Sequence, residues 1–426
     1  MQNRYRQISL LFLAFLLLVL FLFGYTPTND GDGYIEYARM CIDYGEPYPC
    51  APTINGQPFI WNIGQINLVA LSLYLFHSVY PILVLMCFLK AASAYLLARI
   101  AQKTCNDKIG LIALLLYVCY PNNWGQSTTI LSEIPSITLL LGAVFIILHT
   151  SRVRNLFIAG MLMAVANWFR PISLVFMGTF LLYFLFFKNK QWLRSFSSLL
   201  AGYTLFIFVV GTTCWLRTGY FLYQSETLWF NMAAATYETS VEPHYNAEAY
   251  PKGTIRYIDH MNHMKDKTAI ECNQIWKQRC LEWLKDNKAN YLTKIPGRLV
   301  YMYMNDMDNI PAFMHDKSKA QNNYVTLPYR TLLYNLQNLS YIQWLGLLNM
   351  IYYAFLLLTF AFSLHVLQSE KKYDTLFLLC CIVIGGSLAL VLAVHGETRF
   401  KAPFMPFIFM GAAVSIYKIT HKRRTF

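Results

Sequence analysis

Two aspartates separated by a single glycine, Asp30 and Asp32, stand directly after the first long apolar stretch of the chain. A carboxylate fixed at a helix end can act as a general base or bind a cation. Either residue could instead cap a helix beginning near Tyr34, because its side chain would accept hydrogen bonds from the free N–H groups there. Neighbouring carboxylates can serve both purposes. We therefore take Asp30 and Asp32 as catalytic candidates, with Glu36 in a supporting role.

A third acidic position, Glu133, stands at the expected outer end of an otherwise apolar helix. A carboxylate close to hydrocarbon is costly unless it is paired or functional. Arg170, in an Asn-Trp-Phe-Arg-Pro sequence, lies at the same expected level and could be its partner. Such a pair could belong to a functional site, or it could simply hold two helices together.

The segment 395–401 reads His-Gly-Glu-Thr-Arg-Phe-Lys and also falls at an expected outer boundary. Its two cations, Arg399 and Lys401, run against the usual bias of Lys and Arg toward the cytoplasmic side. Excess cation there suggests a bound anion such as a phosphate, although snorkelling side chains at the interface would give the same pattern. His395 and Glu397 would support this group.

Membrane helices must position these groups, because the composition excludes a soluble protein. Of the 426 residues, 56% are hydrophobic and only 13% are charged, about half the share of roughly 25% that soluble domains carry. We attribute the net charge of +13 to Lys and Arg at cytoplasmic helix ends. No basic stretch is interleaved with stacking aromatics, so a nucleic-acid partner is not expected.

Ten apolar runs predict ten membrane spans, and the first is an uncleaved anchor because it is too long for a signal-peptide core. With the N-terminus inside, the clusters of Lys and Arg fall on the cytoplasmic side. This holds only if the weaker run 61–80 lies in the outer interface. The expected spans are 8–24, 81–100, 109–121, 130–149, 156–169, 171–187, 196–216, 344–366, 374–394 and 400–418.

The spans divide the chain into three parts: an N-terminal transmembrane module (1–216, with a first outer loop at 26–62), an extracytoplasmic loop subdomain (217–343) and C-terminal transmembrane helices (344–426). Within the loop, 269–304 has apolar residues at helical spacing and predicts a helix lying on the membrane surface. Two pairs of cysteines could form disulfides if these loops face an oxidising compartment. They are Cys41 with Cys50 and Cys272 with Cys280.

Asp30 stands four residues before Tyr34, and an Asn-Gly-Gln-Pro sequence follows at 55–58. This first loop resembles that of the GT-C membrane glycosyltransferases, in particular the family 39-like branch of dolichyl-phosphate-mannose protein mannosyltransferases and aminoarabinose transferases to lipid A. That branch usually has an Asp-Glu pair before the tyrosine. Here Gly31 replaces the second acid, so Asp30 is the matching residue. Ser132-Glu133, Phe169-Arg170-Pro171 and Glu397-x-Arg399-Phe400 resemble family features in the same order.

The resemblance implies a GT-C-like bundle of about 10–12 transmembrane helices, with amphipathic helices at the outer face and the small loop subdomain. It implies an inverting transfer of a hexose or pentose from a polyprenyl-phosphate donor, among membrane lipids, to a protein, lipid or glycan of the envelope. The site would face outward from a bacterial inner membrane.

In that chemistry Asp30 would be the base, and Asp32 would support it or hold a divalent cation, which only some family members require. The cations Arg399, Lys401 and Arg170 would neutralise the leaving phosphate.

Three other functions fit parts of the sequence. A transporter or flippase of lipid-linked sugars also needs boundary cations, but it would carry inverted repeats or paired broken helices. A polymerase or ligase of lipid-linked glycans usually relies on an outer loop rich in arginine, whereas 217–343 mixes both charges. A non-catalytic membrane scaffold would tolerate replacement of Asp30.

Overall fold

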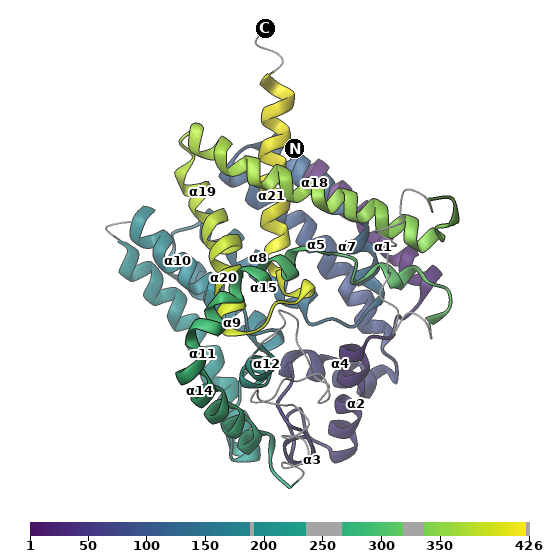
Figure 1. The fold of residues 1–426 in the computed structure, drawn as a ribbon, viewed down its shortest axis with the longest axis vertical. Helices are drawn as coiled ribbons and strands as arrows, with labels where there is room; N and C mark the ends of the chain where they lie inside the picture. Colours follow the sequence, from purple (N-terminus) through teal and green to yellow (C-terminus); the bar gives the residue numbers. More distant parts are fainter. Residues whose placement is uncertain (188–190, 236–265, 318–335, 423–426) are drawn as a thin grey trace.

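The computed structural model describes residues 1–187, 191–235, 266–317 and 336–422, and the regular structure in these ranges is entirely helical (Figure 1). By length and composition, six of the described helical segments can cross a membrane. The chain is therefore an all-α, multi-pass membrane protein, as its composition predicts. The six segments are α1 (Gln2–Phe23), α5 (Tyr80–Thr104), α11 (Trp192–Thr218), α18 (Tyr341–Ser369), Tyr373–Ala393 and Thr398–His421.

The last two of these segments are built from shorter helices. Tyr373–Ala393 contains a π-helical turn between two α-helices, and Thr398–His421 opens with a 3₁₀ helix. The successive elements are α19 (Tyr373–Leu379), η6 (Cys380–Gly385), α20 (Gly386–Ala393), η7 (Thr398–Phe404) and α21 (Met405–Lys422).

The other four expected spans are also helical, but none of them passes alone as a span. α6, α9 and α10 have 12, 17 and 15 residues, fewer than the ~20 that a bilayer requires. α8 becomes a seventh candidate only together with α7 and η1, from which it is bent by 117°. The bounds are α6 (Asp107–Val118), α7 (Pro121–Gly125), η1 (Gln126–Thr128), α8 (Glu133–His149), α9 (Val153–Phe169) and α10 (Ser173–Phe187).

The weaker run 61–80 forms a short helix, α4 (Ile63–Phe76), of only 14 residues. It ends at His77, whose left-handed φ of 51° stops the helix. Tyr74 and Phe76 expose most of their surface. A short helix with an exposed apolar face suits the membrane interface, and α4 is too short to span a bilayer by itself, as are α6, α9 and α10.

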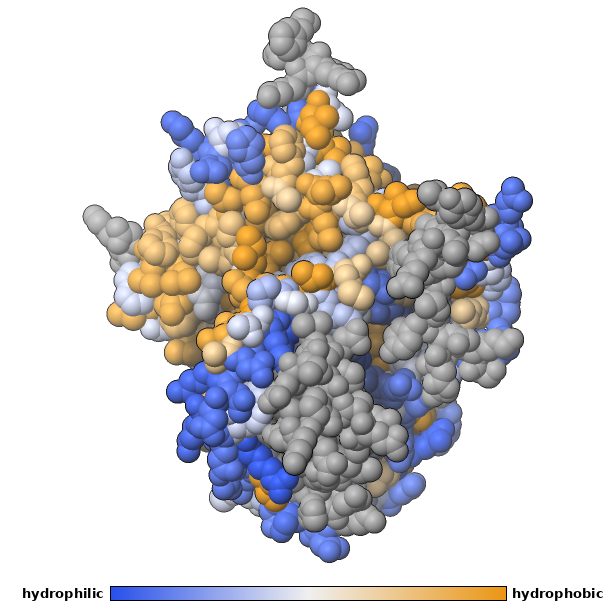
Figure 2. Space-filling model, in the orientation of Figure 1, coloured by the Kyte–Doolittle hydropathy of each residue, from blue (hydrophilic) through white to orange (hydrophobic). Residues whose placement is uncertain are grey.

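The two ends of the molecule differ in character. Figure 2 shows apolar side chains over α10, α19 and α20, and hydrophilic ones over the lower end, where α2 (Asn29–Tyr44), α3 (Ala51–Gly56) and α14 (Ala269–Thr293) lie. Basic residues meet at the opposite end, where Lys418 pairs with Glu370 and Lys108 contacts His421 at 3.3 Å. The basic helix ends at Lys108 and Lys418, which the sequence places on one side of the membrane, therefore lie together.

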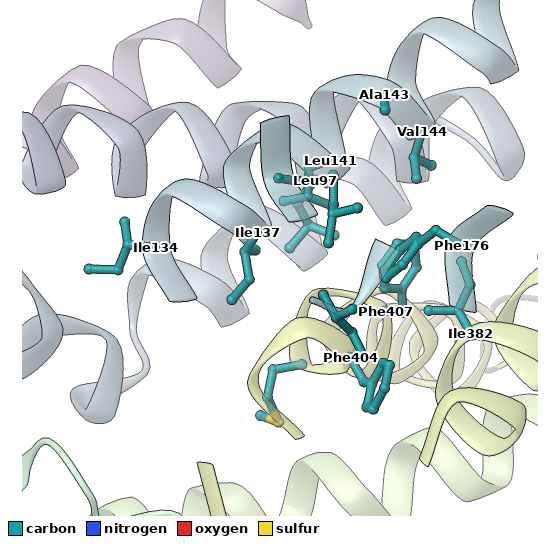
Figure 3. Close-up of a cluster of buried hydrophobic side chains, with 14 of the residues drawn as sticks. Leu97, Ile134, Ile137, Leu141, Ala143, Val144, Phe176, Ile382, Phe404 and Phe407 are labelled. Carbon is teal, nitrogen blue, oxygen red and sulfur yellow. The ribbon is translucent and has the colours of Figure 1, made fainter. Parts of the chain in front are cut away.

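The buried core is formed where α5, α8, α10 and α21 converge. Figure 3 shows Leu97, Ile137, Phe176 and Phe407 pointing into this shared space. Helices α9 and α11 pack closely against each other at two glycines. A Cβ at Gly160 would lie 1.9 Å from the carbonyl oxygen of Leu199, and Gly202 meets the carbonyl oxygen of Phe157 in the same way. Small residues at such contacts allow membrane helices to approach closely.

The expected surface helix 269–304 forms as two helices, α14 and α15 (Ile295–Tyr303). Thr268 and Glu271 cap its start in a capping box, and Asn287 adopts a non-helical conformation inside α14. Parts of the expected loop subdomain, 236–265 and 318–335, lie outside the described residues. The remaining described helices are α12 (Leu228–Ala235), η4 (Ile310–Phe313) and η5 (Leu336–Asn338).

One of the two possible disulfides is excluded by this helix. Cys272 and Cys280 both lie on α14, eight residues and therefore about 12 Å apart along the axis. Their side chains pack with Trp276 in one buried apolar cluster. They cannot reach each other, because a disulfide needs Cα atoms within about 7 Å.

Candidate active site

The start of α2 places the two aspartates, and neither of them caps the helix. The helix begins at Asn29, and the hydroxyl of Thr28 accepts the hydrogen bond from the N–H of Gly31 at 3.0 Å. The alternative of a helix that begins near Tyr34 behind an aspartate cap is therefore wrong, because the helix begins five residues before Tyr34 and Thr28 provides its cap. Both carboxylates lie in the first turn of the helix, where its dipole favours negative charge.

Asp30 and Asp32 point to different surroundings, because residues two apart on an α-helix are rotated by roughly 200° from each other. Asp30 forms an ion pair with Arg399, 369 residues later in the chain. Asp32 accepts a hydrogen bond from the hydroxyl of Tyr25 at 2.9 Å. Burial, and next to it the charge of Asp32, raises the pKa of Tyr25, so this tyrosine donates as a neutral phenol.

Gly31 lies between the two aspartates and has no room for a larger residue. A Cβ at this position would lie 2.8 Å from Oγ1 of Thr28 and 3.1 Å from the hydroxyl of Tyr25. The second acid of the family pattern would therefore displace the helix cap. Glu36 lies further along α2 and is exposed, and it makes no hydrogen bond or ion pair within the described ranges.

Arg399 connects Asp30 to the group at 395–397. Its Nε lies 2.6 Å from Oε1 of Glu397, and Oε2 of Glu397 lies 3.3 Å from Nε2 of His395. The imidazole of His395 is buried, and its Nδ1 faces the carbonyl oxygen of Asn231 at 3.3 Å. This segment therefore delivers one cation and one carboxylate to the start of α2.

The pKa of Glu397 follows from these contacts. Burial by itself would raise it, but the Arg399 guanidinium, the His395 hydrogen bond and the more distant Arg170 outweigh burial and lower the pKa to about 2. Glu397 is therefore an anion across the physiological range.

The expected pair of Glu133 and Arg170 is present beside this group. Nη1 of Arg170 lies 2.7 Å from Oε1 of Glu133, whose side chain is only 4% exposed. Ser132 receives hydrogen bonds from the side-chain nitrogen of Asn62 at 3.0 Å and the hydroxyl of Tyr34 at 3.5 Å. Asn62 also donates to that tyrosine hydroxyl at 2.7 Å.

Five charged residues from four distant segments form one group, which we call the open cluster: Asp30, Glu133, Arg170, Glu397 and Arg399. The guanidinium of Arg170 lies 5.7 Å from the centre of the ring of Phe400, the residue that follows Arg399 in the sequence. The cluster has three carboxylates and two guanidiniums, a formal charge of −1. Asp30, Glu397 and Arg399 keep 23%, 25% and 35% of their side chains exposed, so the cluster opens on this side.

Lys401 does not join the open cluster, contrary to expectation. Its side chain is fully buried, and its ammonium lies 3.0 Å from Oδ1 of Asp306. It also donates to the carbonyl oxygens of Asn305 and Thr398, each at 2.5 Å. With three oxygen partners and no exposed surface, Lys401 has no face left for an incoming phosphate.

Asp306 has two further hydrogen-bond partners besides Lys401. The hydroxyl of Tyr120 donates to Oδ2 of Asp306, and the side-chain nitrogen of Asn349 donates to its backbone oxygen at 2.6 Å. We call Tyr120, Asp306, Asn349 and Lys401 the closed cluster. It joins α18 and η7 to the loop after α15 and to the turn before α7.

The sequence analysis missed Asp306, Tyr120 and Asn349. Asp306 sits in a polar loop sequence and Tyr120 in an apolar run, so neither carries a local signal of pairing. Asn349 is an amide inside the apolar part of a helix suited to lipid, and that signal could have been followed, since buried amides require partners.

The divalent cation considered from the sequence has no preformed site here. Within the described ranges, no group of three His, Cys, Asp or Glu could hold a metal ion. Asp30 and Asp32 face different partners, so they do not form a paired carboxylate site. We therefore derive no step through a metal.

Comparison with known proteins adds no relative. No family model matches the chain, and no curated protein sequence matches it.

Proposed function

We propose that the chain is an inverting glycosyltransferase that moves a sugar from a polyprenyl-phosphate donor to an acceptor hydroxyl at the membrane surface. The observation that carries the proposal is the contact between Asp30 and Arg399. The first loop supplies the acid and the last polar segment supplies the cation, and the resemblance assigns these two residues to the acceptor and donor sides of one reaction. The glycosyltransferase resemblance and the membrane helices support the lipid-linked donor.

Asp30 is suited to the role of base. Its Oδ2 accepts from Arg399, while its Oδ1 forms no hydrogen bond within the described residues. The side chain is 23% exposed, so an acceptor hydroxyl can reach the second oxygen. The ion pair holds the carboxylate in one orientation, and a positioned base contributes about 10²–10⁴-fold to a proton transfer.

The reaction needs no further co-reactant. The acceptor oxygen forms a bond to the anomeric carbon of the sugar while Oδ1 of Asp30 takes the hydroxyl proton. The bond between the anomeric carbon and the phosphate oxygen breaks, and its electron pair stays on the polyprenyl phosphate. Because attack and departure occur on opposite faces of the sugar, the configuration inverts.

Arg399 is the cation placed to stabilise the departing phosphate. Its Nη1 and Nε contact Asp30 and Glu397, and its Nη2 forms no hydrogen bond within the described part of the chain. A phosphate must therefore compete with two carboxylates for this guanidinium. We assign Arg170 the second position and remove Lys401 from the donor site.

Sugar transfer by purified protein in lipid tests the proposal, with a panel of polyprenyl-phosphate sugars and mixed envelope acceptors. We expect Asp30→Asn to lower the rate by about 10²–10⁴-fold. Asp43→Asn is the matched control, because Asp43 lies exposed on the last turn of the same helix and makes no contact with the cluster. Parallel reactions with a chelator measure whether a divalent cation is required.

Two results would contradict the proposal. If Asp30→Asn is as active as wild type, Asp30 is not the base, and Asp32 is tested next in the same way. If wild type transfers no sugar from any donor, lipid translocation is measured instead. The described residues contain one broken helix pair, at α7–η1 and α8, whereas transporters of that kind place one in each half of the chain.

A further inference from the structure

The first loop brings two thiols together at the end of α2 that lies away from Asp30. Cys41 lies in the last turn of α2, and Cys50 is the residue that precedes α3. Their Sγ atoms are 3.4 Å apart. Both side chains are buried, with 1% and 0% of their surface exposed.

Contacts other than the thiols hold the two cysteines in place. After Cys41 the chain reverses at Gly45, in the left-handed conformation with φ 80°, and the N–H of Glu46 donates to the carbonyl oxygen of Cys41 at 3.1 Å. The side-chain amide of Asn67 exchanges two hydrogen bonds with the backbone of Tyr48, at 2.9 and 2.8 Å.

Helix α11 also contacts the loop between Cys41 and Cys50. Nη1 of Arg217, near the end of α11, donates to the carbonyl oxygens of Pro47 and Pro49 at 2.9 and 3.3 Å. It also lies 3.6 Å from the Glu46 carboxylate. The loop between the cysteines is therefore fixed at both ends and in its middle, and the approach of the sulfurs follows from the fold.

In the folded loop, the contact between the two thiols shifts their pKa values in opposite directions. The hydrogen bond from Cys41 lowers the pKa of Cys50 to about 6, against the effect of burial, and Thr53 contributes in the same direction. The same contact with Cys50 raises the pKa of Cys41. A thiolate is the species that attacks a disulfide, but this contact is absent before the loop closes, so either cysteine can be the first nucleophile.

We propose that Cys41 and Cys50 are joined by a disulfide in the mature protein, formed by exchange with a protein disulfide or an oxidised small thiol. The sulfurs of a disulfide are about 2.05 Å apart, so closure needs a shift of little more than 1 Å between side chains that already touch. The proposal does not depend on the transferase reaction.

The exchange is balanced in two steps. The thiolate of one cysteine, for example Cys50, attacks one sulfur of the oxidant disulfide, forming a mixed disulfide and releasing one oxidant thiolate. Cys41 then loses its proton to water and attacks the Cys50 sulfur, and the second oxidant thiolate leaves. Two cysteine thiols are oxidised, and one oxidant disulfide is reduced to two thiols. This must occur before the loop closes, because the folded loop buries both sulfurs.

A disulfide here has a consequence for the topology. Such bonds persist in oxidising compartments and are rare in the cytosol. The loop 41–50 would then face the oxidising side of the membrane, together with α2 and the open cluster at the other end of that helix. The bond would also fix the end of α2 to α3.

Peptide mapping by mass spectrometry tests the bond on the wild-type chain. Cells are quenched in acid with a permeant thiol-blocking reagent, and the protein is purified in denaturant without reductant. Trypsin with a protease that cuts before aspartate separates the two cysteines at Asp43. We expect a linked pair of peptides two hydrogens lighter than the free thiols, with no blocking group on Cys41 or Cys50.

Cys87 is the internal control, because it lies before the next tryptic site, at Lys90, and is buried on α5 away from the pair. It should carry the blocking group without reductant. Blocking of both Cys41 and Cys50 in most molecules would overturn the proposal, as would a link from either of them to Cys87. In a second measurement, reductant should lower the thermal midpoint of wild type by several degrees and leave the double variant Cys41→Ser, Cys50→Ser unchanged. An equal shift in both proteins would count against the bond.

Discussion

Arg399 and Lys401 stand two residues apart on η7, yet they lie in opposite surroundings. Arg399 belongs to the open cluster, with 35% of its side chain exposed and two carboxylates beside it. Lys401 belongs to the closed cluster, fully buried, with Asp306 and two backbone oxygens as partners. Since a 3₁₀ helix has three residues per turn, residues two apart are rotated by roughly 240°. The short helix therefore presents one cation to the open side and the other to the interior.

Charged groups serve two different purposes in this protein. A buried ion pair must satisfy each donor and lone pair to offset the loss of water, and the closed cluster does so from four elements. The open cluster carries an excess carboxylate and leaves one oxygen of Asp30 and two nitrogens of Arg399, Nε and Nη2, without a hydrogen bond within the described residues. Because the open cluster has hydrogen-bonding atoms without partners, it is suited to binding a ligand. The closed cluster, whose charged groups all have partners, is suited to holding helices together.

The largest effect on stability is expected at the closed cluster. Lys401→Met leaves Asp306 as a buried charge without its cation, and breaking such a pair costs about 3–5 kcal/mol of folding free energy. Thermal unfolding in detergent measures the loss. Adding Asp306→Asn to Lys401→Met should recover part of it. An unchanged thermal midpoint in Lys401→Met would mean that the pair does not hold the helices.

Arg399→Met should give the opposite pattern. Removal of a preorganised cation costs about 10²–10³-fold in turnover, while the loss of a partly exposed pair costs only about 1 kcal/mol of stability. Sugar transfer and the thermal midpoint are measured on the same preparation, with Arg399→Lys as the variant that keeps the charge. The comparison fails if Arg399→Met unfolds as readily as Lys401→Met.

Two carboxyl groups, Asp308 beside the closed cluster and Glu397 in the open cluster, should make stability depend on pH with opposite sign. Burial raises the pKa of Asp308, beside the closed cluster, to about 6, so between about pH 4 and 6 the folded chain holds a proton that the unfolded chain has lost. Stability therefore falls as pH rises through this window. The pKa of Glu397 is lowered to about 2, so its contribution is present above about pH 4.5 and is lost only as pH falls toward 2.

Thermal midpoints between pH 4.5 and 7 separate these two contributions. Asp308→Asn should reduce the fall of the thermal midpoint with rising pH in this range. The variant removes only the titrating group, because the Asn side chain can still accept the hydrogen bond that the Thr398 hydroxyl donates to Asp308 at 2.9 Å. Glu397→Gln should leave the slope as it is in wild type. A slope that is unaffected by Asp308→Asn would show that this carboxyl does not titrate there.

The smallest effect is expected at an exposed pair with the same chemistry. Lys418 and Glu370 contact each other at the basic end, with 36% and 38% of their side chains exposed. Surface pairs of this kind contribute about 0–1 kcal/mol. Lys418→Met is therefore the reference for Lys401→Met in the same unfolding measurement, and a comparable loss at both positions would remove the distinction between buried and exposed pairs.

Much of the architecture could be predicted from residue order. The ten apolar runs are all helices, and the pair of Glu133 with Arg170 is present at 2.7 Å. The number of full spans was less predictable. An apolar run marks a helix, but Asn106 caps α6 at its start, and α7 and η1 bend the chain before α8.

The open cluster was predictable in part. Asp30, Glu133, Arg170, Glu397 and Arg399 could be selected because charged groups at apolar boundaries are costly unless they are used. Their mutual pairing could not be selected, because the contact from Asp30 to Arg399 spans 369 residues. The cap at Thr28 was missed because Thr, Asn and Asp are all good caps, and only the backbone decides among them.

The sequence by itself determined that this chain is a helical membrane protein with polar groups at helix ends. In a lipid environment each backbone N–H and C=O needs an internal partner, so a long apolar run can only become a helix. The tertiary structure decided the role of each charge. Arg399 and Lys401 look alike along the chain, and the rotation of a short helix, with Asp30 on one side and Asp306 on the other, sends them to different partners.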